Sequence, residues 1–290
     1  MAIPSNPTIA EIVTEGLKRS GRTSPTATQI SDATTHQLRE VKADIMLLAP
    51  THPYLETNAW TYSIKGQGRY TLPSEANIPV SLVCFAGPTT WSGTAQAGSG
   101  PTITLASTIN EDELNLLGKY VLLTGGTGAA QARACIGWNN TTKVWSVDSA
   151  WTTSPDSTST FQILHTATNL WPAEDTPSEF DARVYPHAVG TPRVSALYGD
   201  EFLLYPTPEL STYGLFFRYY VDLDQVDDAG TLFINLLREW RSLWIQGIAV
   251  KCDQRYDEDR YQTELQVYRA MLEALTSQTT RVIRKRFIDI

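Results

Sequence analysis

This chain of 290 residues has few of the side chains that carry most enzyme and metal chemistry. Its three cysteines and four histidines are far apart in the sequence: Cys84, Cys135, Cys252, His36, His52, His165 and His187. None of them has the spacing of a metal site, a redox pair or a catalytic motif. We therefore predict reduced, mostly buried thiols, as in a protein made in a cytoplasm, and neither a metal nor any other cofactor.

Long hydrophobic runs and a strong net charge are also lacking. No stretch approaches about eighteen uninterrupted apolar residues, and the first residues have neither the basic nor the apolar part of a signal peptide. Charged residues make up 19% of the chain and sum to −8, which argues against a general nucleic-acid surface. Hydrophobic residues make up 42%, which is typical of one large folded domain or two ordinary ones. We expect no membrane and no sequence-specific nucleic acid among its partners.

No segment predicts an active site. The glycine-rich run Leu123–Ala130 lacks the Lys-Ser/Thr ending of a phosphate-binding loop, so we interpret it as a tight turn. The acidic run 222–230 is faintly similar to a calcium loop, but Val226 and Phe233 stand where oxygen ligands are needed, which favours an exposed loop before a helix. The triplet Glu111-Asp112-Glu113 is interpreted as a solvated turn. A catalytic pair of carboxylates for hydrolysis is not excluded by the sequence, because two such residues need only lie close together in the folded protein. We nevertheless predict that this is not an enzyme.

Helical patterns occur at both ends of the chain. Apolar residues from Ile9 to Leu17 share one helix face, and Gly21 ends this helix. A second helix is predicted from Ser24-Pro25 to about Leu48. From Thr231 to Leu275 the pattern predicts two more amphipathic helices. Four of their residues are predicted to make core or subunit contacts: Trp240, Trp244, Leu265 and Tyr268.

Between these helices the sequence predicts β structure. Trp60–Ile64 and Arg69–Leu72 have the pattern of a hairpin, and Pro79–Phe85 is a third strand. A later group is interpreted as a meander with turns at Gly199-Asp200 and Pro206–Pro208. Its strands are Arg193–Tyr198, Glu201–Tyr205 and Tyr213–Val221, the last of which is expected to be covered on both faces.

From residue 87 to about 165 the composition shifts to Gly, Thr, Ser and Trp, with few charges. Turn residues separate five candidate strands: Thr102–Leu105, Tyr120–Thr124, Ala132–Trp138, Lys143–Val147 and Thr160–Leu164. Short strands at this spacing predict a small β-sandwich or barrel. The fold class is therefore α+β: a helical bundle of N- and C-terminal helices with a β meander and an inserted β module. The predicted domains are a core of residues 1–85 and 167–290, and the inserted module 86–166.

The end of the chain is basic and apolar. Four cations are interleaved with aliphatic and aromatic residues in the order Arg281, Val282, Ile283, Arg284, Lys285, Arg286, Phe287 and Ile288. Because the whole chain sums to −8, the other residues together carry −12. The pattern favours an arm that is buried against an acidic or apolar partner surface. The alternative is a frayed end that only keeps the protein soluble.

The eight tryptophans and thirteen tyrosines allow two interpretations. They fit a sugar-binding face, but several fall on core-facing positions, which favours a core or a subunit interface. In the module, Trp91, Trp138 and Trp151 lie in or beside expected turns. They lead to the prediction that the module points outward and makes accessory contacts, with a purely filling role as the alternative.

The order of these parts resembles the head-to-tail adaptor, or head-completion, proteins of tailed bacteriophages, especially short-tailed ones. The resemblance rests on the N-terminal helix pair, the strand Tyr70-Thr-Leu-Pro73, the stretch Tyr198–Pro206 with its continuation Thr207-Pro208, the C-terminal helices and the basic tail. It covers roughly residues 1–85 and 167–290, and it is specific in order rather than in any single motif. The block 86–166, with Trp91–Gly98 and Gly118–Gly128, looks like a module seen in phage virion proteins.

The resemblance implies a structural virion protein that forms a homo-oligomeric, dodecameric ring. Its tail would dock on the portal protein, the opposite side would meet the tail nozzle or tail tube protein, and the module would reach tail fibre or spike. The ring would continue the channel for DNA ejection, and net acidity suits a channel that must not hold phosphates. The implied location is the head–tail junction of the virion, after assembly in the host cytoplasm. The runner-up is a carbohydrate-binding or tail-fibre/spike-attachment protein, and a cell-wall hydrolase is third.

Overall fold

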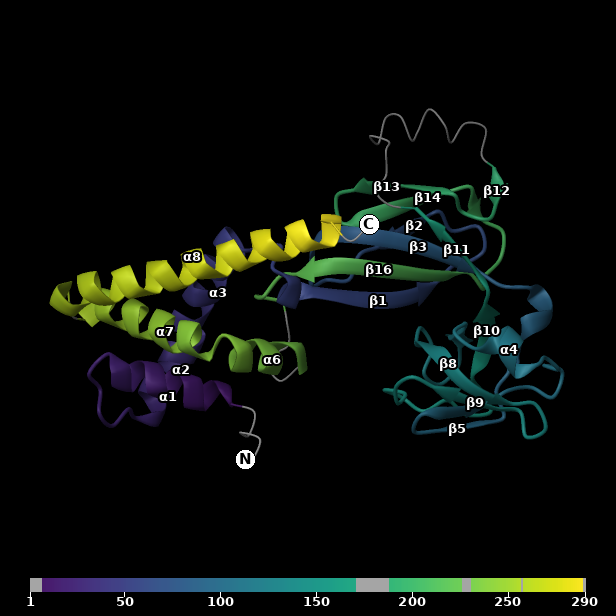
Figure 1. Ribbon diagram of the computed structural model, residues 1–290, viewed down its shortest axis with the longest axis horizontal. Coiled ribbons are helices and arrows are strands. Elements are labelled where there is room, and N and C mark those ends of the chain that lie inside the picture. Colours follow the sequence, from purple (N-terminus) through teal and green to yellow (C-terminus); the bar gives the residue numbers. More distant parts are fainter. Residues whose placement is uncertain (1–6, 171–187, 226–230, 257, 289–290) are drawn as a thin grey trace. The chain divides into compact units, whose positions relative to one another are not determined.

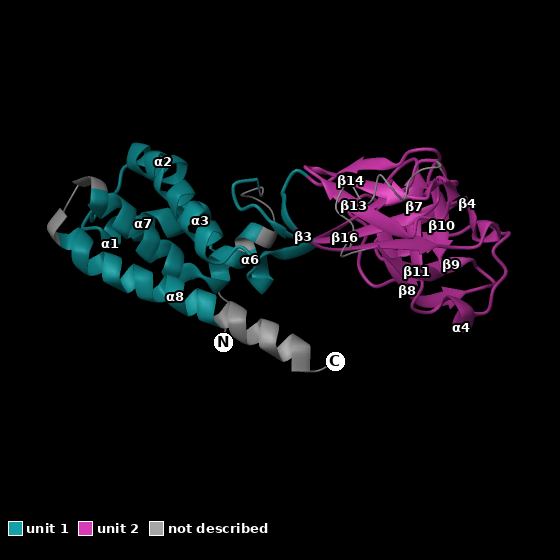
Figure 2. Ribbon diagram, turned by 90° about the horizontal axis from the view of Figure 1, so that it is seen from above, with its two compact units in different colours: residues 1–57, 74–78, 219–290 teal, residues 58–73, 79–218 magenta. Residues whose placement is uncertain are grey.

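The computed structural model describes residues 7–170, 188–225, 231–256 and 258–288 (Figure 1). It is a mixed α+β structure, about one third helix and one third strand, with several antiparallel sheets. The α+β class is thereby confirmed. The chain divides into two compact units (Figure 2): unit 1 comprises residues 1–57, 74–78 and 219–290, and unit 2 comprises residues 58–73 and 79–218.

Unit 1 contains helices from both ends of the chain. Their bounds are α1 Ile9–Arg19, α2 Ala27–Thr35, α3 Gln37–Leu48, the short 3-10 helix η1 Pro53–Leu55, α6 Thr231–Glu239, α7 Arg241–Tyr256 and α8 Glu258–Ile288. Helix α7 packs against α1, α3, α6 and α8. The six residues predicted to share one face of this region are all buried: Leu236, Leu237, Trp240, Leu243, Trp244 and Ile248. Helix α7 also buries Ala249, Val250 and Cys252, so its burial is not confined to that face.

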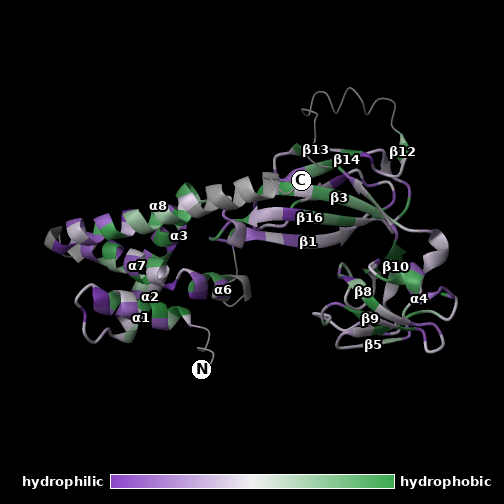
Figure 3. Ribbon diagram, in the orientation of Figure 1, coloured by the Kyte–Doolittle hydropathy of each residue, from purple (hydrophilic) through white to green (hydrophobic). Residues whose placement is uncertain are grey.

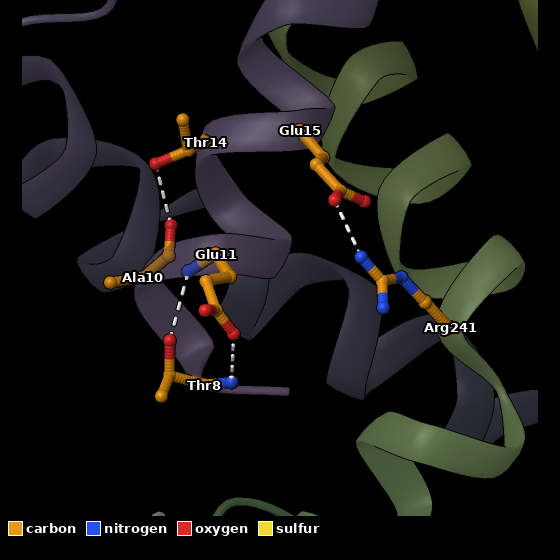
Figure 4. A network of polar contacts seen from close by, with 6 residues as sticks. All are labelled: Thr8, Ala10, Glu11, Thr14, Glu15 and Arg241. Atoms are coloured by element: carbon orange, nitrogen blue, oxygen red, sulfur yellow. Dashed lines mark hydrogen bonds and ion pairs between the residues drawn. The ribbon is translucent and has the colours of Figure 1, made fainter. Parts of the chain in front are cut away.

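Helix α1 begins where the sequence offers an N-terminal cap. The Thr8 hydroxyl accepts from the Glu11 N–H (3.2 Å), and the Glu11 carboxylate accepts from the Thr8 N–H (2.8 Å) (Figure 4). This reciprocal pair satisfies backbone donors that no helical carbonyl reaches. One turn on, Glu15 forms an ion pair with Arg241 of α7 at 2.5 Å. Hydrophobic and hydrophilic residues both occur along α1 (Figure 3), and its buried residues include Ile12.

Two predicted helices are broken, and both predictions were wrong in the same way. The helix expected from Ser24 to Leu48 is two helices, α2 and α3, joined at His36. The hydroxyls of Thr34 and Thr35 donate back to carbonyls of the preceding turn, which loosens the backbone ladder there. The first C-terminal helix is likewise interrupted at Trp240, between α6 and α7.

Most strands lie in unit 2. Before the module they are β1 Glu56–Tyr62, β2 Arg69–Thr71 and β3 Ala76–Ala86; after it come β11 Thr166–Asn169, β12 Val189–Gly190, β13 Val194–Tyr198, β14 Glu201–Tyr205, β15 Thr207–Pro208 and β16 Gly214–Val221. They form a four-stranded sheet in the order β1-β16-β3-β11, a three-stranded sheet β13-β14-β2 and a small pair β12-β15. Figure 1 shows β1, β16 and β3 side by side.

The strand pairing differs from two predictions. The expected hairpin of β1 and β2 does not form, because β2 pairs with β14, with Tyr70 opposite Phe202. Buried Ser63 directs the chain away from β2: its hydroxyl donates to the Leu210 carbonyl (2.6 Å) and accepts from the Tyr213 N–H (3.1 Å). The expected meander is also incomplete. Strands β13 and β14 pair as predicted, whereas β16 lies in the other sheet, between β1 and β3.

The module contains the five predicted strands. Its elements are η2 Thr89–Trp91, β4 Ser92–Thr94, β5 Ala97–Ser99, β6 Thr102–Thr104, α4 Glu113–Leu116, β7 Tyr120–Gly125, β8 Ala132–Asn139, β9 Val144–Val147 and β10 Thr160–Leu164. Seven strands join in the order β4-β10-β7-β8-β9-β6-β5 around a cluster of buried residues that all come from 95–163. On one side, Leu122 and Leu164 pack against Trp60 and Phe85 of the neighbouring sheet. The independence of domain 86–166 stays a prediction.

Candidate interaction surfaces

The four residues predicted to make packing contacts lie in unit 1. Trp240, Trp244 and Tyr268 are buried, and Leu265 is half-buried on α8. The Trp244 indole N–H donates to the Leu236 carbonyl at 3.1 Å, which ties α7 to α6 across the break at Trp240. These side chains therefore pack inside one copy of the chain.

A polar cluster joins α3, α7 and α8. The Asp44 carboxylate lies 2.8 Å from the Lys251 ammonium, and it accepts from the Tyr268 hydroxyl at 3.2 Å. Burial first, and then the charge of Asp44, raise the pKa of Tyr268, so this phenol stays protonated and donates. The cluster fixes the lateral position of three helices, and its geometry is that of a structural contact.

The predicted anchoring residues Arg281–Ile288 lie at the end of α8. The backbone is helical to Ile288, but the side chains from residue 278 onward lie outside the part that the structure describes. The last described buried residue of α8 is Leu275, and Ser277 is exposed. The role of the tail stays a prediction.

A groove of about 480 Å³ lies beside the junction of α6 and α7 in unit 1. Its apolar lining includes Tyr54, Trp240, Met271 and Leu275, and its charged lining comes from α6 and α7. Next to it, His52 is buried against the edge of Trp240, and its Nδ1 accepts from the Tyr54 N–H at 3.3 Å. Burial lowers the pKa of His52 to about 4, so the ring is neutral at pH 7.

A second groove of about 480 Å³ belongs to unit 2 and is mainly apolar. It lies between β1 and β2, each of which is the outer strand of its sheet. Tyr70, Leu72 and Pro73, from the motif Tyr70-Thr-Leu-Pro73, contribute to its lining together with Ile64. Behind the groove the ring of Tyr70 stacks on Phe202 at 5.2 Å, so this motif serves the core and the groove at once.

The module tryptophans are core residues. Trp138, Trp145 and Trp151 are buried in the module's central cluster, and Trp91 is half-buried against it. The core interpretation of the aromatic residues is confirmed for these three. The idea that Trp138 and Trp151 are aromatic turns facing a partner was wrong, because Trp138 belongs to strand β8 and both side chains are buried in the core of the module.

The acidic triplet 111–113 is more than a solvated turn. Glu111 accepts from the indole N–H of Trp91 at 2.9 Å, and Glu113 accepts from the backbone N–H of Trp138 at 3.2 Å. Asp112 is exposed at the start of α4. Two of the three carboxylates therefore hold tryptophans in place, a role that sequence spacing did not reveal.

Other predictions concern chemistry. The glycine-rich run is the turn between antiparallel β7 and β8, as predicted, with Gly126 and Gly128 at positive φ. All three cysteines are free and buried, and burial raises the pKa of Cys84 to about 12 and that of Cys135 to about 11.

Among the described residues, no cluster of His, Cys, Asp or Glu is arranged to hold a metal, and no helix is long and apolar enough to cross a membrane. His187 and residues 226–230 lie outside the described residues.

Comparison with known proteins adds no relative. No protein-family model matches the sequence, and no curated protein is similar to it. The functional argument therefore rests on the residues of this chain.

Proposed function

We propose that this chain is a head-to-tail adaptor of a short-tailed bacteriophage. In this proposal it is a structural protein of the virion and not an enzyme. Copies form a dodecameric ring at the head–tail junction, between the portal protein and the tail nozzle or tail tube protein, and the ring continues the DNA channel. The core is a helical bundle built from both ends of the chain, and the small β-sandwich or barrel 86–166 is an accessory module that can reach tail fibre or spike.

One observation carries the proposal: the backbone of the long terminal helix continues well past Leu275, its last described buried residue. Helix α8 is held against α7 by Tyr268, Leu272 and Leu275, and its backbone stays helical to Ile288. The part beyond Leu275 contains four of the chain's cations and five of its aliphatic or aromatic residues. A segment of this composition gains free energy when it is buried against an apolar surface with acidic groups, because charge alone contributes little at exposed sites.

The arrangement of the core supports the same proposal. Helices from the two ends of the chain pack together on α7, so the base of the terminal arm is fixed by contacts from distant parts of the sequence. A fixed base reduces the ordering cost of binding, which for a free arm is on the order of 1–2 kcal/mol per residue. The sequence resemblance to adaptor proteins then names the portal as the partner.

The test uses purified portal rings and the full-length chain. Wild-type protein should co-sediment with the rings, and the deletion of 279–290 should remove binding while circular dichroism keeps its helical signal. A matched pair of variants separates the two contributions: Ile283→Ser/Phe287→Ser removes apolar area, and Arg284→Gln/Arg286→Gln removes charge. At high salt, where charges are screened, we expect the apolar pair of substitutions to weaken binding more than the charge pair does. Undiminished binding by the deletion variant would reject the anchor, and electron micrographs without rings on the portal would reject the adaptor.

The carbohydrate-binding or fibre-attachment alternative loses its main motivation. It relied on module tryptophans as a binding platform, and three of them are buried in the module core.

A further inference from the structure

An exposed apolar patch lies on the module where α4 packs against β8. It consists of Leu114, Leu117 and Ile136, whose exposed fractions are 87%, 42% and 62%; we call it the α4 patch. Leu114 and Leu117 are three residues apart on the same short helical turn. The Gly118 N–H donates to the Cys135 carbonyl at 3.0 Å, which brings the segment that follows α4 next to the stretch of β8 that contains Ile136.

The exposure of Ile136 is built into the sheet. The pairing of β8 with β9 shifts register between Cys135 and Gly137, so Ile136 is the extra residue of a β-bulge. A bulge turns a side chain out of the regular alternation of a strand, and bulges are common at functional sites. Cys135 is buried on one side of Ile136 and Trp138 on the other, so Ile136 is the only residue of this stretch, Cys135–Trp138, with a large apolar side chain exposed.

Carboxylates lie along one side of the α4 patch. Glu111, Asp112 and Glu113 directly precede Leu114, and the first and third are held in place by Trp91 and Trp138. The neighbouring cation, Lys119, is directed over the Trp91 ring at 5.9 Å. The patch is thus a small apolar surface with a net acidic edge. Its chemical complement is a segment that presents apolar residues together with several cations.

The end of this chain has that composition. It carries Arg281, Arg284, Lys285 and Arg286, and its backbone is helical to Ile288. Ile283 and Phe287 are four residues apart, which is the spacing of two anchors on one helix face. We propose that residues 279–290 of a second copy of this chain dock on the α4 patch, with the aliphatic and aromatic residues on the patch and the cations toward Glu111, Asp112 and Glu113.

Such a contact joins unlike surfaces of two identical chains. Each copy has one tail and one patch, so the contact is heterologous and can be repeated from copy to copy. A tail that is docked on a patch cannot dock elsewhere at the same time. This inference goes beyond the portal proposal and does not depend on it.

The test is complementation between two full-length variants. The patch variant Leu114→Ser/Ile136→Ser keeps its tail, and the tail variant Ile283→Ser/Phe287→Ser keeps its patch. Sedimentation velocity of the wild type should show association that increases with protein concentration. Each variant alone should associate only at protein concentrations at least about tenfold higher than the wild type needs. The reason is that each copy loses the apolar area of two large side chains. Mixing the two variants should restore a one-to-one pair that grows no further, since only one intact joint exists.

Control variants make each outcome decisive. Leu47→Ser/Val189→Ser removes two equally exposed aliphatic residues elsewhere and should associate as the wild type does. Asp112→Asn should weaken association mainly at low salt. A wild-type protein that is monomeric at every concentration would overturn the proposal. This includes the case in which the tail binds the α4 patch of its own chain. Mixed variants that stay monomeric would overturn it as well. The patch variant has an intact tail, so its binding to portal rings reports on the adaptor proposal separately.

Discussion

The imidazole ring of His52 stands nearly perpendicular to the indole of Trp240, with an interplanar angle of 85° and ring centroids 4.9 Å apart. His52 precedes η1, and Trp240 lies at the break between α6 and α7, so the contact joins the N-terminal and C-terminal helices of unit 1. Burial lowers the pKa of His52 to about 4 from a usual value of 6.5. The folded protein therefore holds this ring neutral over a range in which the unfolded chain protonates it.

The first prediction follows from that difference. Because the unfolded state binds the proton more readily, stability is lost as pH falls from about 6.5 toward about 4. We expect His52 to contribute a loss of about 2 kcal/mol in the free energy of unfolding between about pH 7.5 and about pH 5. Urea unfolding at both pH values should show a smaller loss for His52→Gln. His36→Gln is the control and should keep the wild-type dependence, because it leaves His52 in place. An unchanged pH dependence in His52→Gln would contradict the burial of a neutral ring.

The second prediction concerns two glycines where helices approach closely. A Cβ at Gly16 would lie 2.7 Å from Ile248 of α7, and a Cβ at Gly247 would lie 2.7 Å from Val41 of α3. Alanine favours helix over glycine by about 1 kcal/mol, but overpacking a core costs about 1–3 kcal/mol. Gly16→Ala and Gly247→Ala should therefore lower the melting temperature. Gly137→Ala, whose new methyl group would meet nothing nearer than 3.6 Å, should leave it nearly unchanged. A rise in stability for Gly16→Ala would show that α1 and α7 are farther apart.

Local patterns predicted the elements of this chain better than their pairing. The module strands were visible because alternating residues are separated by turn signals such as Gly125-Gly126. The pairing of β2 with β14 could not be predicted in this way, because its partners, such as Tyr70 and Phe202, are far apart in the sequence. The breaks at His36 and Trp240 were missed for a related reason. The apolar stripe continues through both positions, and only hydrogen bonds and tertiary packing interrupt the helix.

The candidate site shows the same limit. Trp244 and Tyr268 were found by helical spacing, since buried faces repeat along a helix. The α4 patch was not found, because a bulge that exposes Ile136 leaves no mark in the alternation of polar and apolar residues. The cations of the tail were visible from composition alone, and composition does not reveal which surface they meet.

The third prediction tests the core of unit 1. Trp244 is fully buried, and its ring packs against Phe233 with centroids 5.7 Å apart. Removing a buried tryptophan side chain costs about 3–5 kcal/mol, so Trp244→Ala should unfold at much lower urea or fail to fold. Leu47→Ala, at a leucine that is 80% exposed, should change the free energy of unfolding by about 0.5 kcal/mol or less. Wild-type stability of Trp244→Ala would place this residue on the surface and undo the assignment of the helix face.

The last prediction concerns the independence of the module. Ala86 and Thr166 are direct partners in the pairing of β3 with β11, so a short Gly/Ser linker can close the gap left by removing residues 87–165. The buried residues of unit 1 come from other parts of the chain, and the shortened protein should keep the full helical circular dichroism signal. Removal of Leu122 and Leu164 uncovers Trp60 and Phe85, so a second version with Trp60→Thr and Phe85→Thr guards against aggregation.

The fragment 86–166 should in turn show the near-ultraviolet signal of buried tryptophans, because its central cluster is complete without the rest of the chain. Loss of the helical signal in both shortened proteins would show that the module is part of the core of the whole protein.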